Sequence, residues 1–172
     1  MKKVVFLSLV LIALWFAGCA SMSSGPSASV TLAPTSGSTA NGTVTFVQRA
    51  DGSVDVSAHL TGVPPGVHGF HIHDKGDCGD NGNAAGGHFN PMSVAHGAPS
   101  ADPHHAGDFG NVTADAQGVV DTKFNTHSIT VAAGASSVVG HAVILHANPD
   151  DLATQPTGNA GPRIACGIVQ MK

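Results

Sequence analysis

The stretch TVTFVQRADGSVDVSAHL, residues 43–60, decides the fold class of this chain. Its beginning, residues 43–47, alternates polar and apolar side chains, and so does its end, residues 54–60. Between them lies the turn sequence Ala50-Asp51-Gly52-Ser53. Alternation with a period of two places apolar side chains on one face of a strand, so the stretch predicts a β-hairpin.

The remaining chain contains further short strand candidates, at residues 67–73, 110–114, 119–124, 128–131, 138–146 and 163–170. No convincing helical period of apolar residues accompanies them. Many short strands with frequent turns predict an all-β antiparallel sandwich or barrel. Two long segments, 74–105 and 147–162, interrupt the regular spacing. Loops of that length in compact domains are usually functional or disordered.

The N-terminus has the pattern of a targeting segment. Two lysines precede an apolar run at residues 4–16 and small residues at 17–18, which predicts a signal peptide over residues 1–18. The run is shorter than the roughly 20 residues that span a bilayer, although a single anchoring helix remains the alternative. Residues 16–19 resemble a bacterial lipobox, so we expect Cys19 to be lipidated. Residues 19–29 would then be a flexible tether, and 30–172 the domain of a protein anchored to a membrane of the cell envelope or periplasm.

The two other cysteines, Cys78 and Cys166, form an even number in an exported chain. This favours a disulfide over two unpaired buried thiols.

Charge excludes one class of partner. Without the signal peptide, five basic residues stand against eleven aspartates, so the net charge is 5 − 11 = −6 with histidine neutral. No basic patch is available for nucleic acid, which is therefore not an expected partner.

Histidines concentrate in HGFHIHDKGDCGDNGNAAGGHFNP, residues 68–91. His71 and His73 lie two apart on a predicted strand, so their side chains share one face and can converge on one metal ion. Downstream, three imidazoles and one carboxylate have the composition of a structural zinc site: His88, His96, His105 and Asp108. His146 ends another predicted strand and could approach the first pair. For any one histidine alone, a solvated or hydrogen-bonded role is the alternative.

Six stretches carry a resemblance to a known family: GVHGFHIH (66–73), GGHFNP (86–91), HGAP (96–99), HAGDFGNV (105–112), VILH (143–146) and GNAGPRIACGI (158–168). In this order and spacing the chain resembles the copper/zinc superoxide dismutases, specifically an exported bacterial form. The resemblance implies an eight-stranded Greek-key β-barrel, immunoglobulin-like, with two long functional loops. It also implies disproportionation of superoxide to dioxygen and hydrogen peroxide at a copper ion that is alternately reduced and reoxidised.

The resemblance further implies a ligand set and roles for individual residues. The copper ligands would be His71, His73, His88 and His146, and the zinc ligands His88, His96, His105 and Asp108. The shared His88 would also transfer a proton. Asp150 would link His71 to His96, Arg163 would dock the anion beside copper, and Thr157 would line the channel.

Two departures from the family concern steering and assembly. Residues 153–156 are neutral where many members carry charged residues, so we expect weak electrostatic steering of superoxide. Cys78 stands where bacterial relatives place it. A homodimer is possible, but the oligomeric state does not transfer from the family.

We expect the histidines outside the ligand set to have structural or surface roles. His104 neighbours His105, but the HAGD motif favours His105 as the ligand. We expect His68 to hydrogen-bond within the barrel, and the other three to be surface or structural residues: His59, His127 and His141.

Three other functions are alternatives to the dismutase activity. A metal-storage module would not need Arg163 as an anion-docking group. A zinc hydrolase would need an open metal position and a general base, but the chain has no glutamate. A domain switched by pH would not need its histidines in ligand geometry.

Overall fold

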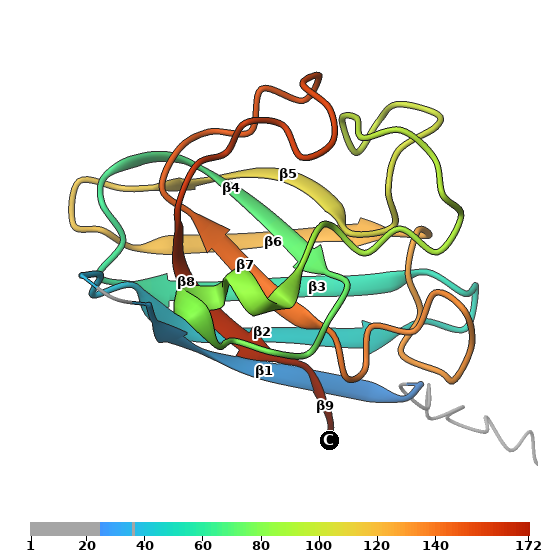
Figure 1. Ribbon diagram of the computed structural model, residues 1–172. Helices are drawn as coiled ribbons and strands as arrows, with labels where there is room; N and C mark the ends of the chain where they lie inside the picture. Colours follow the sequence, from blue (N-terminus) through green and yellow to red (C-terminus); the bar gives the residue numbers. More distant parts are fainter. Residues whose placement is uncertain (1–24, 36) are drawn as a thin grey trace, which may run out of the picture.

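The computed structural model describes residues 25–35 and 37–172 (Figure 1). The expected signal peptide and Cys19 lie outside these residues. Nine strands and one short 3₁₀ helix occur in the described part, in the order β1 (Ser27–Pro34), β2 (Asn41–Gln48), β3 (Val54–Thr61), β4 (Gly66–His73), η1 (Asp80–Ala85), β5 (Asp108–Ala114), β6 (Val120–Thr126), β7 (Ala142–His146), β8 (Arg163–Ile168) and β9 (Gln170–Met171). Within the same residues, no helix is long and apolar enough to cross a membrane.

The strands form an antiparallel barrel with the order β5-β4-β7-β8-β1-β2-β3-β6, and the two-residue β9 pairs with β1. This confirms the expected all-β fold with eight barrel strands. The chain crosses from one side of the barrel to the other after β3 and again after β6, which gives the Greek-key order. Where β5 meets β6, the rings of Phe109 and Phe124 pack edge to face, 5.0 Å apart between centroids.

The hairpin predicted from residues 43–60 is confirmed. β2 and β3 pair over their full lengths, with Val44 opposite Ala58 and Phe46 opposite Val56. These four side chains are buried, while their neighbours in sequence are half-buried or exposed. The alternation in the sequence therefore corresponds to the two faces of the sheet.

The first strand was not predicted. β1 begins at Ser27, so the strand extends into the segment expected as tether, three residues before the expected boundary at residue 30. Its residues are mostly small or polar, but apolar side chains alternate along it, and Ala28, Val30 and Leu32 are buried. Burial of these side chains against the barrel makes the segment a strand.

Three further expectations need correction. Residues 128–131 form only an isolated bridge, because the Gln48 side chain accepts the Val131 N–H at 2.7 Å in place of a strand partner. The strand predicted at 138–146 begins only at Ala142, since Gly140 turns the chain with φ +87°. Segment 74–105, expected without regular structure, contains η1.

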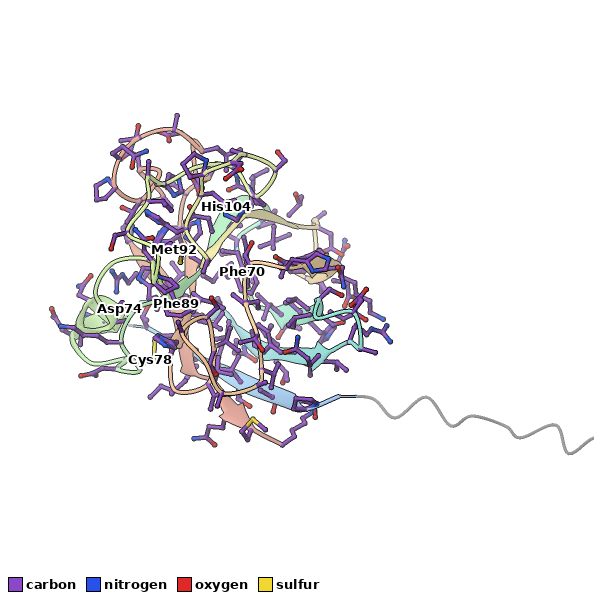
Figure 2. The ribbon with its side chains drawn as sticks, turned by 90° about the vertical axis from the view of Figure 1, so that its right-hand side faces the viewer. Phe70, Asp74, Cys78, Phe89, Met92 and His104 are labelled. Atoms are coloured by element: carbon purple, nitrogen blue, oxygen red, sulfur yellow. A yellow bond between two sulfur atoms is a disulfide. The ribbon has the colours of Figure 1, made fainter. Side chains whose placement is uncertain are left out.

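The two long segments lie outside the barrel (Figure 1). Figure 2 shows Asp74, Cys78, Phe89 and Met92 on the side that segment 74–105 covers. The predicted disulfide is confirmed: it joins Cys78, beside η1, to Cys166 on β8, with 5.8 Å between the Cα atoms. It fixes the first part of segment 74–105 to the barrel wall.

Candidate metal centre

Four buried histidines gather where β4 and β7 pair. His71 and His73 lie on β4 opposite Ile144 and Ala142, and His146 ends β7. An isolated β-bridge places His88 beside His73. One ring nitrogen from each of these four side chains lies within 4.8 Å of all the others. We call this group the strand half.

A second cluster shares His88 and adds His96, His105 and Asp108, and we call it the loop half. Asp108, the first residue of β5, lies at its centre. Its Oδ1 atom is 2.7 Å from Nδ1 of His88 and 3.0 and 3.2 Å from Nδ1 of His96 and His105. Bonds of ~2.0 Å in a tetrahedron give ligand-to-ligand distances of about 3.3 Å. The loop half therefore has nearly the dimensions of a tetrahedral metal site.

Backbone carbonyls decide which nitrogen of each strand-half imidazole carries the proton. Nδ1 of His73 donates to the Gly86 carbonyl at 2.9 Å, and Nδ1 of His146 donates to the Gly161 carbonyl at 3.1 Å. In the neutral rings both Nε2 atoms then carry lone pairs, and they face each other at 3.2 Å. Two lone pairs at that distance repel, and a cation between them would turn the repulsion into coordination.

Hydrogen bonds also decide which nitrogen carries the proton in three further histidines. Nε2 of His71 and Nε2 of His96 donate to the two Asp150 oxygens at 2.8 and 3.0 Å. Nε2 of His105 donates to the Val94 carbonyl at 3.1 Å. The Nδ1 atoms of all three rings are left buried without a hydrogen-bond partner. Buried polar atoms rarely lack a partner, so these three lone pairs fit the role of metal ligands.

His88 is the one member of both clusters. Its Nδ1 faces Asp108 in the loop half, and its buried Nε2 faces the strand half without a hydrogen-bond partner. If Nδ1 gives its proton up, both nitrogens of this one imidazole carry lone pairs and can bind two ions at once. The residues present therefore fit two metal ions joined by His88.

Burial sets the charge state of the ligands. It lowers the pKa of His71 to about 4 and the pKa of His146 to about 3, so both rings are neutral at physiological pH. Neutral imidazole is the form that binds metals. Burial alone would raise the pKa of Asp108, but hydrogen bonds from His88 and from two backbone amides hold it well below its usual value. The loop half thus keeps a negative charge.

Arg163 stands beside the strand half at the start of β8. Its guanidinium donates to the carbonyls of Gly82 and Gly86, and Gly86 also accepts from His73. Burial lowers the pKa of Arg163, but a guanidinium stays charged in proteins. Arg163 as a residue is half-buried. Thr157 is also half-buried, in the segment between Asp150 and Arg163.

Residues 40–169 match the family model described as copper/zinc superoxide dismutase. The chain belongs to this family. It is 42% identical over 137 residues to superoxide dismutase [Cu-Zn] 2 of Mesembryanthemum crystallinum, which covers 76% of this chain and 87% of that protein. The solved structure of the clock protein EA4 superposes with a TM-score of 0.78 at 37% identity, over 85% of this chain and 94% of that one. The enzyme accordingly catalyses superoxide dismutation, and the family implies copper and zinc.

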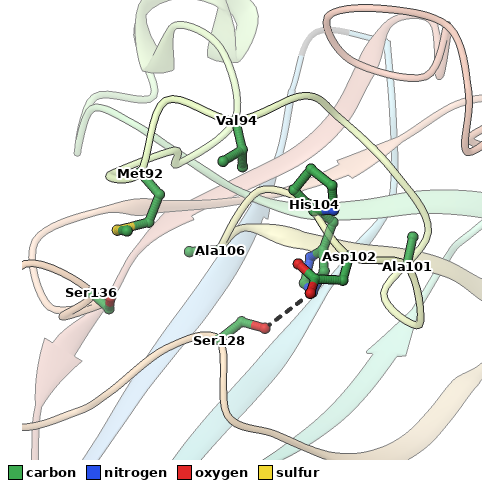
Figure 3. Close-up of a pocket in the computed structure, with 9 residues that line it drawn as sticks. Met92, Val94, Ala101, Asp102, His104, Ala106, Ser128 and Ser136 are labelled. Carbon is green, nitrogen blue, oxygen red and sulfur yellow. Dashed lines mark hydrogen bonds between the residues drawn. The ribbon is translucent and has the colours of Figure 1, made fainter.

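His104 lies outside both clusters of this dismutase. Its Nδ1 donates to the His105 carbonyl at 2.7 Å, and its Nε2 lies 3.3 Å from the Ser128 hydroxyl in a separate surface depression (Figure 3). The structure places His105, not His104, beside Asp108. His68 contacts the carbonyls of Pro64 and His146 at 2.7 and 2.8 Å, so it hydrogen-bonds within the barrel as predicted.

Two residues that hold the dismutase site were missed from the sequence. Asn111 on β5 accepts the Asp150 N–H at 2.7 Å and donates to the Asp150 carbonyl at 2.9 Å. Gln155 makes a similar pair of bonds to the backbone of His96. Asn111 lies in the HAGDFGNV motif, which was a usable indication, whereas nothing in the local sequence indicates the role of Gln155.

Proposed function

We propose that this dismutase binds copper through His71, His73, His88 and His146, and zinc through His88, His96, His105 and Asp108. The observation that carries the proposal is the convergence of buried, unpartnered lone pairs on two points that share His88. When bound, copper supplies one-electron reduction and oxidation, while zinc has no redox chemistry and serves as a structural ion.

The protein's own groups then bind the anion and move its protons. Two superoxide anions and two protons give one dioxygen and one hydrogen peroxide. Arg163 carries a permanent positive charge, fixed by two backbone carbonyls, and docks each anion at the strand half. Nε2 of His88 has no other partner in the protein, so whenever it is not coordinating it can hold one proton and deliver it to the reduced substrate, and solvent supplies the second proton. Thr157 lines the channel and limits the size of the anion.

Asp150 orients the ligands of both halves. It accepts hydrogen bonds from His71 on one oxygen and from His96 on the other. Such outer partners fix the tautomer and the ring direction of metal-binding histidines. Asp150 therefore couples the geometry of the copper ligands to that of the zinc ligands.

We also propose that the enzyme is exported, with residues 1–18 removed, Cys19 lipidated and the domain held in the cell envelope or periplasm of a bacterium. The Cys78–Cys166 disulfide supports this location, because disulfides persist in oxidising compartments. A homodimer is compatible with the fold. Mass spectrometry of the N-terminal peptide from membrane fractions tests the anchor, since an unmodified Cys19 would contradict it.

The test of function compares the copper- and zinc-loaded protein with His73→Ala and with the surface control His59→Ala. Loss of a residue that hydrogen-bonds to a metal ligand typically lowers metal affinity or activity by about 10–100-fold. We therefore expect loss of the ligand itself to lower superoxide removal by more than about 100-fold. The exposed His59 lies on β3 and pairs with Asp121, and its removal should leave the rate unchanged. Full activity in His73→Ala would refute the ligand assignment.

A further inference from the structure

Gln155 holds the backbone of a proposed zinc ligand from a different loop. Its Oε1 accepts the His96 N–H at 2.9 Å, and its Nε2 donates to the His96 carbonyl at 2.8 Å. The two contacts give His96 the pair of hydrogen bonds that a neighbouring strand would otherwise provide. Figure 1 shows segment 147–162 and the later, yellow-green part of segment 74–105 standing next to each other above the strands.

His96 depends on this contact because its own segment has no regular structure. Residues 93–98 are neither helix nor strand, yet His96 as a whole residue is only 4% exposed. A buried backbone N–H or C=O without a partner is unfavourable. The side-chain amide of Gln155 supplies partners for both groups of His96.

Gln155 is itself fixed by a closed turn. Gly158 N–H donates to the Thr154 carbonyl at 2.7 Å, and Asp151 N–H donates to the Gly158 carbonyl at 2.8 Å. The Asp151 carboxylate accepts the backbone N–H of Ala153 and Thr154 at 3.0 and 2.8 Å. The turn that carries Gln155 is therefore ordered by its own hydrogen bonds.

The same loop also holds the ring of His96. Asp150 accepts from its Nε2 at 3.0 Å, and Nδ1 then points to Asp108. With the backbone fixed by Gln155 and the ring by Asp150, the direction of Nδ1 is set from one segment. We infer that Gln155 is a positioning residue that retains zinc by fixing the backbone of His96, an inference that rests on the zinc assignment proposed above.

The experiment compares Gln155→Met and Gln155→Glu with wild type. Methionine has a similar length and removes both hydrogen bonds, whereas glutamate keeps the acceptor for the His96 N–H and loses the donor. Gln117→Met, in the exposed turn between β5 and β6, is the matched control. Zinc loss from the copper–zinc protein to a chromogenic chelator is followed at neutral pH. Visible absorption of a cobalt(II) derivative reports the geometry of the zinc position.

We expect Gln155→Met to release zinc about 10–100-fold faster, Gln155→Glu to fall between it and wild type, and Gln117→Met to match wild type. The cobalt spectrum should change in Gln155→Met, and the unfolding midpoint of the metal-free protein should fall modestly, because two buried backbone groups lose their partners.

Equal zinc release in all four proteins would overturn the inference. So would a lower midpoint of metal-free Gln155→Met with an unchanged cobalt spectrum, which would indicate general loop stabilisation. Wild type that retains no zinc at all would refute the zinc assignment itself, and the inference with it.

Discussion

The strand half and the loop half of the metal centre are built by different means. Three of the four strand-half histidines lie on β4 and β7, whose backbones are fixed by the ladder of sheet hydrogen bonds. In the loop half, His96 and His105 lie outside strands and are held by side chains from elsewhere, above all Asp108, Asp150 and Gln155. Sheet register thus sets one geometry, while side-chain hydrogen bonds across loops set the other. The loop half should therefore be the easier one to disturb.

Removal of the disulfide is the largest perturbation that we expect. Replacement of Cys78 and Cys166 by serine frees the segment that carries Gly82 and Gly86 from the barrel wall. The chain-entropy model gives about 4–5 kcal/mol for a loop of this separation, 88 residues. Denaturant unfolding of the metal-free protein measures the change. A loss below about 1 kcal/mol would show that the segment is held without the covalent link.

Acid should lower the free energy of unfolding of the metal-free protein through a histidine of the strand half. Burial holds the pKa of His71 at about 4 in the folded state, below the value of about 6.5 in an unfolded chain. Its contribution to stability is complete above pH 6.5 and is lost as the pH falls through 4, and it amounts to about 3 kcal/mol. Unfolding free energies measured across this range should decline, and less so in His71→Asn. An equal decline in both would contradict the assignment to His71, and His59→Asn serves as the surface control.

Gly158→Ala should weaken zinc binding in the loop half more than copper binding in the strand half. A Cβ atom there would lie 1.8 Å from Oδ1 of Asp150, and the residue has a φ of +68°, which side chains disfavour. Displacement of Asp150 should weaken zinc binding by about 10–100-fold, while copper binding should change less because His73 and His146 are held by carbonyls. Metal titrations measure both affinities. Gly87→Ala, whose Cβ would meet nothing within 4 Å, is the control, and equal losses of both metals in Gly158→Ala would refute the separation.

Ionic strength should have the smallest effect. Residues 153–156, in the segment between Asp150 and Arg163, carry no charged side chain that could steer an anion. We expect kcat/KM for superoxide to change by less than about twofold between low and physiological salt. A steep fall with added salt would show that charges elsewhere steer the substrate, and Thr154→Lys should then steepen the fall further.

Local patterns predicted the parts of the fold that depend on local interactions. The hairpin at residues 43–60 combines alternation with a turn sequence, and both act within a few residues. β1 was missed because its serine-rich composition resembles a linker, although burial against the barrel makes it a strand. Residues 128–131 were wrongly predicted as a strand because Gln48, about 80 residues away, satisfies their backbone.

The sequence by itself determined the all-β class. It also indicated that a set of imidazoles, one aspartate and one arginine belong to a metal site. Only the tertiary structure decided which nitrogen of each imidazole is free to bind an ion. The reason is that a histidine's tautomer follows from the partner of its other nitrogen. Those partners, the carbonyls of Gly86, Gly161 and Val94 and the carboxylate of Asp150, come from segments 11 to 79 residues away in the chain.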